Sequence, residues 1–120
     1  MTKYKQKVGD FGEALAEKYL LTKGYQVIAK KVKTSYQEID IVAKFKEKLV
    51  FVEVKTRTNN YSGLSEDSFS QRKLNNLKSA IKKYLMGKDI DYNTIRLDLI
   101  VINIDKRKKI ANLQHFKDIF

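Results

Sequence analysis

The strongest constraint on this chain is a pair of apolar segments of strand length that contain charged residues. The segments read EIDIVA and LVFVEVK, and together they predict a β-hairpin over residues 38–55. A charge inside a core strand is costly unless it is paired or binds a metal. Because strand side chains alternate, we expect Glu53 and Lys55 on one face, and Glu38 and Asp40 together on one face of the neighbouring strand. The hairpin thus predicts a cluster of carboxylates and one ammonium group at one end of a sheet.

The rest of the hydrophobic pattern predicts an α/β protein with a small mixed β-sheet flanked by helices. Two segments have apolar residues at helical spacing and are followed by a glycine, which commonly ends a helix. Residues 1–8 are polar and basic and are expected to form a loose arm or the lead-in to the first helix. The other expected elements, in order, are a helix over 9–23, a strand over 25–32, the hairpin over 38–55, a polar loop over 56–68, a helix over 69–86, a strand over 95–104, a basic turn over 106–109 and a short edge strand over 110–113.

Composition narrows the class of protein. A chain of 120 residues with 42% hydrophobic residues predicts one domain, over residues 1–120, with a modest core. Cysteine is absent, which excludes disulfides, thiolate zinc sites and cysteine nucleophiles and suits a cytoplasmic location. No apolar run approaches the roughly 18 residues of a membrane span, so no membrane partner is expected.

The net charge of +11 favours a polyanionic partner, chiefly nucleic acid, through phosphate contacts and counterion release. A lysine-rich surface that serves only solubility is the alternative interpretation.

The hairpin carboxylates suggest a metal site. The side chains of Asp40 and Glu53, with the backbone carbonyl of Val54, form a set of hard oxygen donors that suits Mg²⁺ or Mn²⁺. Lys55 could hold the attacking water and stabilise developing negative charge. Glu13, in the first helix, would be a further ligand or would orient metal-bound water, although a glutamate there also suits a helix N-terminus. The alternative for Glu53 and Lys55 is a structural ion pair.

These residues resemble the PD-(D/E)xK motif of restriction-endonuclease-like nucleases. More closely, the chain is similar to the YraN-like family of small bacterial proteins, which are regarded as endonucleases distantly related to archaeal Holliday junction resolvases. The resemblance covers about residues 9–116. It is carried by Gly12, Glu13, Ala16 and Leu20, by EIDIVA over 38–43, by VFVEVKTR over 50–57, by Gly63, by Arg72 or Lys73, and by Arg96 with Asp98.

The resemblance implies a restriction-endonuclease-like fold and a Mg²⁺-dependent or Mn²⁺-dependent endonuclease that hydrolyses phosphodiester bonds in DNA, including branched or junction DNA. Its active-site positions correspond to Glu13, Asp40, Glu53 and Lys55. Junction resolution would require two sites and hence a homodimer. The alternative is a catalytically silent nucleic-acid-binding or adaptor module with the same fold.

The chain departs from the family pattern at two places. Gln37 stands where the family usually has glycine, and the segment from Lys31 to Lys33 stands in place of an Asn-x-Arg pair. Glu38 is either an auxiliary site residue or structural, and no role is assigned to His115. The expected phosphate contacts, each equally consistent with a solvated surface charge, are Lys31, Lys33, Arg57, Arg72, Lys73 and Arg96.

Overall fold

The described part of the protein is built on one continuous β-sheet. In the computed structural model, residues 3–58 and 70–119 are described. The elements are α1 (Lys3–Thr22), β1 (Gln26–Val32), β2 (Ile39–Phe45), β3 (Lys48–Thr58), α2 (Gln71–Leu85), the 3₁₀ turn η2 (Tyr92–Thr94), β4 (Ile95–Asp105) and β5 (Ile110–Phe116).

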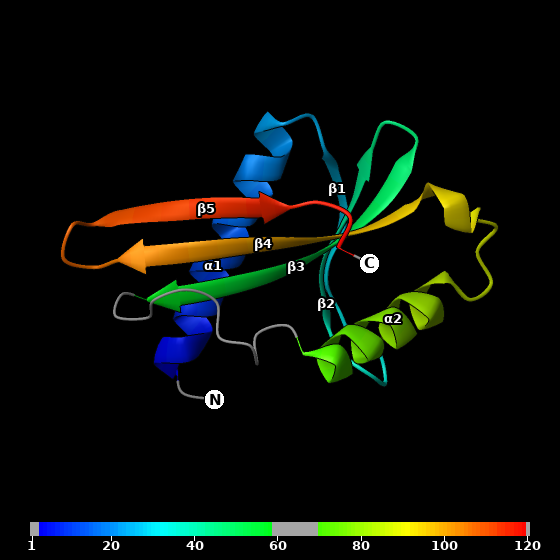
Figure 1. Cartoon of the computed structure of the whole chain (residues 1–120), viewed down its shortest axis with the longest axis horizontal. Helices are drawn as coiled ribbons and strands as arrows, with labels where there is room; N and C mark the ends of the chain where they lie inside the picture. Colours follow the sequence, from blue (N-terminus) through cyan, green and yellow to red (C-terminus); the bar gives the residue numbers. More distant parts are fainter. Residues whose placement is uncertain (1–2, 59–69, 120) are drawn as a thin grey trace.

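The sheet has five strands in the order β1-β2-β3-β4-β5 (Figure 1). β3 and β4 are parallel, and every other neighbouring pair is antiparallel. A parallel pair needs a crossover connection, and α2 lies in that connection, between β3 and β4. The α/β class and the small mixed sheet flanked by helices, both predicted from the sequence, are confirmed.

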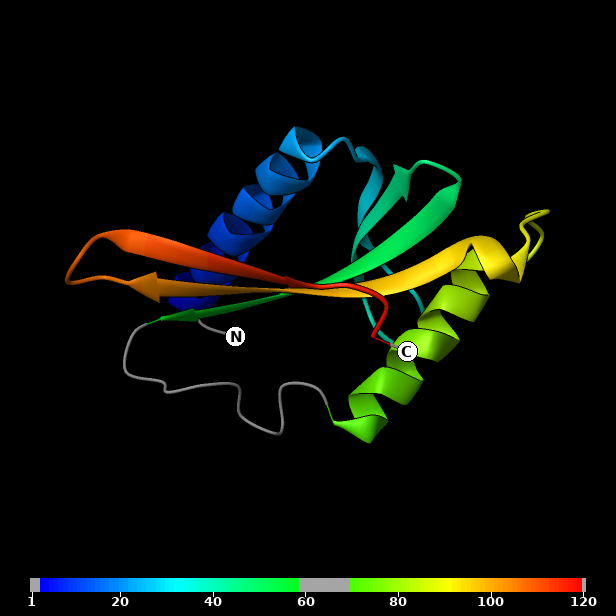
Figure 2. The ribbon, with the colours of Figure 1, turned by 45° about the horizontal axis from the view of Figure 1, so that its top comes forward.

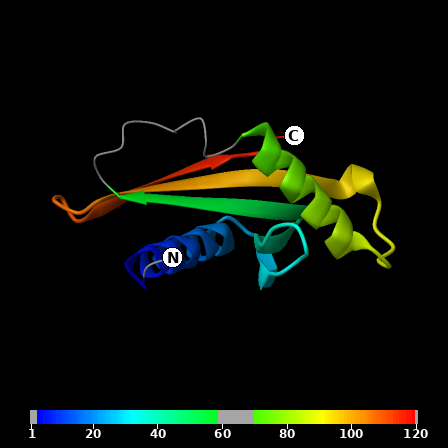
Figure 3. The same cartoon turned by 90° about the horizontal axis from the view of Figure 1, so that it is seen from below.

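The two helices cover opposite faces of the sheet (Figure 3). Ile41 and Val52 pack with the buried face of α1, whereas their neighbours Val42 and Phe51 pack with α2. Side chains alternate along a strand, so a strand buried on both faces is apolar throughout. This is why the β2–β3 hairpin reads as two nearly unbroken apolar segments.

β3 is longer than the sequence pattern predicts. Residues 56–58, predicted as the start of a loop, continue β3 because they pair with residues 102–104 of β4. Thr56 and Thr58 are β-branched and suit a strand, and the pairing with β4 supplies their backbone hydrogen bonds. The remainder of the predicted loop, with Gly63, and the predicted helix start at Phe69 lie outside the described residues.

Of the two expectations for the N-terminal segment, the helix lead-in is confirmed for residues 3–8 and the loose arm is wrong there. These residues form the first turns of α1. They contain lysine and glutamine, which favour helices, and no proline, so nothing stops the helix from extending. The Tyr4 ring also lies 4.1 Å from the Lys106 ammonium, beside the turn between β4 and β5.

The other boundaries differ little from the prediction. Ser70 caps α2, and its side chain accepts a hydrogen bond from the Lys73 N–H. β5 extends to Phe116, further than predicted, because it pairs along most of β4. Neither α1 nor α2, in the described part of the chain, has the length and hydropathy of a membrane-crossing helix.

Two glycines of α1 give a matched test of how closely this helix approaches the sheet. A Cβ at Gly12 would lie 1.7 Å from Thr56 Oγ1, whereas within the described residues a Cβ at Gly9 would have no heavy atom within 4 Å. Gly12→Ala should therefore destabilise the fold by about 2 kcal/mol or more through overpacking. Gly9→Ala should stabilise it by about 0.5–1 kcal/mol through helix propensity. Denaturant unfolding of both variants checks this, and equal effects would contradict the close approach.

Candidate active site

Asp40 and Glu53 lie side by side where the β2–β3 pairing ends. The register pairs Ile41 with Val52, and one further step places Asp40 opposite Glu53. The Val54 N–H donates a hydrogen bond of 2.8 Å to Asp40 Oδ2. The two carboxyl groups therefore lie next to each other at the end of the β2–β3 pairing.

The closeness of Glu53 changes the protonation of Asp40. Burial, followed by hydrogen bonding with Glu53 and the charge of Glu53, raises the pKa of Asp40 to about 9. The hydrogen bond from the Val54 N–H acts in the opposite direction but is outweighed. Two like charges in contact cannot both be ionised cheaply. Without a cation, the pair therefore retains a proton at neutral pH.

Glu13 reaches the same region from α1. Burial and then the charge of Asp40 raise the pKa of Glu13 to about 7, while Lys31 lowers it and Glu38 and Asp10 raise it further. Because Gly12 has no side chain, α1 can approach β3 closely at Thr56. The close approach brings Glu13 within electrostatic reach of Asp40.

A group of cations adjoins the carboxyl pair. Burial, followed by the charges of Lys73 and Arg57, lowers the pKa of Lys55, and the charge of Glu53 partly offsets this. Lys55 and Arg57 alternate with Val54 and Thr56 along β3, and Lys73 comes from the first turn of α2. Three cations that repel one another beside two acids form a place suited to a phosphate group.

Gln37 is a site residue that the sequence analysis did not assign. Its Nε2 donates a 3.0 Å hydrogen bond to Glu53 Oε2. The turn that holds it depends on Thr34, whose hydroxyl donates to the Gln37 carbonyl and accepts from the Gln37 N–H. Gln37 is not among the residues with positive φ. Glycine is therefore not required here, and a side chain that reaches Glu53 is tolerated.

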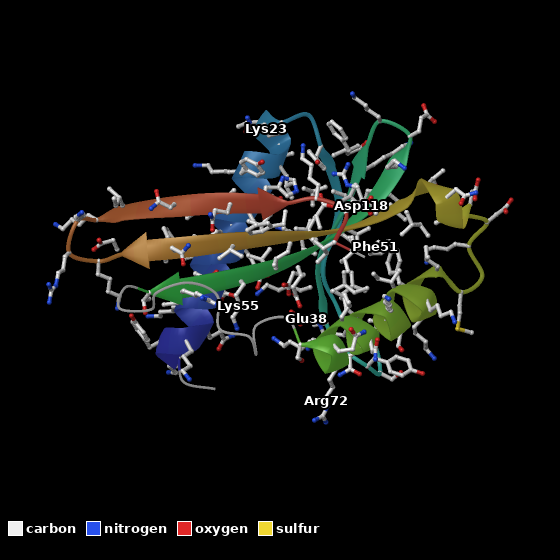
Figure 4. All side chains as sticks on the ribbon, viewed as in Figure 1. Lys23, Glu38, Phe51, Lys55, Arg72 and Asp118 are labelled. Atoms are coloured by element: carbon white, nitrogen blue, oxygen red, sulfur yellow. The ribbon has the colours of Figure 1, made fainter. Side chains whose placement is uncertain are left out.

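The other predicted site residues differ in their positions. Lys31 forms a 2.6 Å ion pair with Asp10 near Glu13, and Lys33 is exposed just beyond β1. Glu38 is exposed, and its charge raises the pKa of both Asp40 and Glu13. Figure 4 shows Lys55 and Glu38 in the central part of the molecule, whereas Arg72 points away from the sheet.

Comparison with known proteins shows which family this chain is similar to. The model of the uncharacterised protein family UPF0102 matches residues 12–102. The chain is 34% identical over 116 residues to the UPF0102 protein of Roseiflexus castenholzii, covering 96% of this chain and 94% of the relative. It is 35% identical over 120 residues to that of Clostridium perfringens, covering 100% and 98%.

The chain belongs to the UPF0102 family. The resemblance to YraN-like proteins is thereby confirmed. The matched region runs from Gly12 to Ile102, so it contains Glu13, Asp40, Glu53 and Lys55 and ends before β5. The family description carries no activity, and the roles of these residues rest on their chemistry.

The donor set of this UPF0102 protein fits a divalent cation. In residues 3–58 and 70–119, no group of three or more histidine, cysteine, aspartate or glutamate side chains is arranged to hold a metal ion. Asp40 and Glu53 form a pair, and Mg²⁺ commonly uses one or two carboxylates while keeping several waters. A cation at this pair would replace the retained proton. The Val54 carbonyl and Glu13 remain predicted ligands.

Arg96 was predicted as a phosphate contact, and the structure contradicts this. Its guanidinium donates to both carboxylate oxygens of Asp98, at 2.9 and 2.8 Å, and to the Tyr25 hydroxyl. The Arg96 side chain is 14% exposed, and Asp98 is fully buried. His115 Nε2 lies 2.7 Å from Asp98 Oδ2, and its Nδ1 lies 2.9 Å from the Tyr19 hydroxyl. The group lies on the α1 face.

These contacts favour the ionised form of Asp98. Burial on its own raises the pKa of Asp98, but hydrogen bonds with His115, Arg96 and the Asp118 N–H outweigh it, so the net pKa is lowered. The contacts therefore stabilise the fold above the ordinary aspartate pKa, and this stability is lost as the pH falls through the lowered value. Both Arg96 and His115 are thus structural.

Removing Arg96 should accordingly cost stability and leave nucleic-acid binding unchanged. Arg96→Ala leaves a buried carboxylate with fewer partners, so we expect a loss of about 3 kcal/mol in the free energy of unfolding at neutral pH. Lys82→Ala, at an exposed position of α2, is the control and should change stability little. Denaturant unfolding and DNA-binding titrations measure both effects. A variant of normal stability with weakened DNA binding would restore the phosphate-contact interpretation.

Asp40→Asn should stabilise the metal-free protein. The raised pKa of Asp40 means that folding becomes less favourable as pH rises from about 4 toward about 9. Asparagine keeps an acceptor for the Val54 N–H and adds a donor toward Glu53, so we expect a gain on the order of 2 kcal/mol at pH 8 in EDTA and a smaller gain at pH 5. Thermal unfolding at the two pH values checks this, with the exposed Asp89→Asn as the control.

Magnesium should reverse the order of stability. A cation that binds the folded wild type raises its Tm, and the Asp40→Asn variant should lose this shift. A gain in the variant that does not depend on pH would contradict the carboxyl pair as its cause.

Proposed function

We propose that this UPF0102 protein is a metal-dependent nuclease that hydrolyses phosphodiester bonds in DNA. The observation that carries the proposal is the pair of contacting carboxyls, Asp40 and Glu53, with Lys55 near Glu53 and with Arg57 and Lys73 within electrostatic reach of Lys55. Acids placed together at a cost in stability, next to cations that repel one another, are typical of a functional site. A phosphate group bridged to the acids by a divalent cation would relieve both repulsions.

Each side chain has a distinct task in this proposal. Asp40 and Glu53, with the Val54 carbonyl, would hold Mg²⁺ or Mn²⁺, which when bound supplies a more acidic water and neutralises charge on the phosphate. Gln37 holds Glu53 in place through its 3.0 Å hydrogen bond. Lys55 Nζ donates to the attacked phosphate, where negative charge develops as the bond from phosphorus to the leaving oxygen breaks.

Glu13 is suited to the proton of the attacking water. A carboxyl with a pKa of about 7 is partly ionised at neutral pH, so it can accept a proton and release it again. Arg57 and Lys73 would bind flanking phosphate oxygens. None of these contacts reads a base, which is consistent with a substrate chosen by its shape.

The substrate class rests on charge and on family resemblance. The net charge of +11 suits a polyanion, and the resemblance to nucleases related to junction resolvases favours branched or junction DNA. Resolution of a symmetric junction would need a homodimer with two sites.

A nucleic-acid-binding module without turnover is the second candidate. The observation that favours it is the hydrogen bond from Gln37 to Glu53, because this amide uses a carboxylate oxygen that a metal ligand would need. The cations Lys55, Arg57 and Lys73 would then bind phosphate without hydrolysing it.

Lys55→Ala separates the two candidates. If Lys55 stabilises charge that appears only in the transition state, cleavage should fall by about 100-fold or more while DNA binding changes only a few-fold. Lys44→Ala, at an exposed position on β2, is the control and should affect neither. Cleavage of linear, flapped and four-way DNA with Mg²⁺ or Mn²⁺ provides the measurement, together with binding in EDTA. Wild type that binds DNA, cuts none of these substrates with either metal and shows no thermal shift would establish the binding module instead.

A further inference from the structure

The turn between β4 and β5 carries four consecutive cations that the candidate active site does not use. Residues 106–109 read KRKK, and all four are exposed. The Lys106 ammonium lies 4.1 Å from the centre of the Tyr4 ring, so the turn adjoins the start of α1. We call this turn the basic end, and it consists of Lys106, Arg107, Lys108 and Lys109.

The charges of the basic end are held close together by the fold. Asp105 Oδ1 accepts hydrogen bonds from the backbone N–H groups of Arg107, at 3.0 Å, and Lys108, at 3.2 Å, which fixes the turn. The first turn of α1 contains no acidic residue, although a helix N-terminus favours one. Like charges within the Debye length of about 10 Å repel one another. The arrangement is therefore unfavourable until a polyanion neutralises it.

The basic end lies in line with the candidate active site. Glu53 pairs with Leu99 of β4, and β4 runs on to Asp105, a distance of about 20 Å at roughly 3.3 Å per residue. Lys55 and Arg57 advance along the parallel strand β3 in the same direction and on the same face as Glu53. The β4–β5 turn lies at the far end of the molecule from α2 (Figures 1 and 2).

Polar side chains occupy the sheet surface between the two regions. Arg57 pairs with Asn103 of β4, and Asn103 pairs with Asn112 of β5, so these three residues form one row across the strands. Amide and guanidinium groups can all donate hydrogen bonds to phosphate oxygens. A chain of phosphate-binding groups thus leads from Lys55 toward the basic end.

We propose that the basic end holds one duplex arm of the DNA substrate, contacting phosphates about six base pairs from the bond presented to Asp40 and Glu53, at about 3.4 Å per base pair. This inference rests on the proposed function, which places the scissile phosphate. A duplex fits because it carries phosphate charge along the whole distance of about 20 Å between the two regions. The contacts are made to the backbone, so they would add affinity and orientation without sequence preference.

A charge-removal variant tests the binding role. The variant combines Lys106→Gln, Arg107→Gln, Lys108→Gln and Lys109→Asn, the last because Lys109 has a φ of +54°, which asparagine tolerates. The control combines Lys44→Gln, Lys46→Asn, Lys82→Gln and Lys83→Gln, which removes the same charge from the end of β2, the β2–β3 turn and the last turn of α2; asparagine is used at Lys46 because its φ is also +54°. Binding to a 30-base-pair duplex is measured in EDTA at several salt concentrations, after circular dichroism shows native folding. A partial variant, Arg107→Gln with Lys108→Gln, covers the case in which the full variant does not fold.

The full variant should reduce the magnitude of the slope of log affinity against log salt by about 3, and the partial variant by between 1 and 2, at about 0.9 per lost phosphate contact. The control should change the slope by less than about 1. Equal changes in the variant and the control would overturn the proposal, since the turn would then act only as general surface charge. So would a loss of binding to phosphatidylglycerol vesicles with DNA binding unchanged, which would assign the basic end to lipid.

A position-specific measurement tests the geometry. The chain has no cysteine, so Lys108→Cys creates a unique attachment point for an iron–EDTA cleavage reagent, with Lys82→Cys as the control. Radical cuts from position 108 should centre about six base pairs from the enzymatic cut, whereas position 82 should give a different pattern. Matching patterns would overturn the proposal. Should the protein bind DNA without cutting it, the salt titration still decides the role of the basic end, so failure of the nuclease and failure of this inference are distinguishable.

Discussion

The strand β3 lies at the centre of the sheet, and the positions of the other elements depend on it. This strand pairs with β2 on one side and with β4 on the other, and its first half is buried on both faces, with Phe51 toward α2 and Val52 toward α1. Its second half, from Glu53 onward, has polar side chains on the α2 face. One strand therefore supplies the centre of the core and, a few residues later, the acids and cations of the candidate site. The rigidity of the first half holds the second half in position.

The carboxyl groups of Asp98 and Asp40 have partners of opposite kinds. On the α1 face, Asp98 is fully buried but receives hydrogen bonds from Arg96, the Asp118 N–H and the His115 ring, and its pKa is lowered. At the end of the β2–β3 pairing, Asp40 faces another acid, and its pKa is raised. The charge of Asp98 is balanced by partners within the chain. The Asp40–Glu53 pair instead needs a proton or a cation between the two carboxyl groups. This contrast separates a structural ion pair from a candidate active site.

The helix α1 contacts several parts of the protein that lie far apart in the sequence. The missing side chain of Gly12 lets the helix approach Thr56, and the next residue, Glu13, then acts electrostatically on Asp40. The same helix carries Tyr19 to His115 on its own face and Tyr4 to Lys106 at its start. α1 therefore contacts the candidate site, the residues around Asp98 and the basic end. A substitution at Gly12 that moves α1 would affect all three.

The sequence by itself determined the α/β class, the β2–β3 hairpin and the grouping of Asp40 with Glu53, because alternation along strands is a local property that the hydrophobic pattern records. The tertiary structure decided what depends on distant partners. Residues 56–58 became strand because β4 pairs with them, and Arg96 became structural because Asp98 and Tyr25 hold its guanidinium. Gln37 reached Glu53 through a turn set by Thr34, and residues 3–8 became helix beside a turn roughly a hundred residues later. The contacts of Arg96 with Tyr25 and of Gln37 with Glu53 join residues far apart in the chain, and no local pattern encodes them.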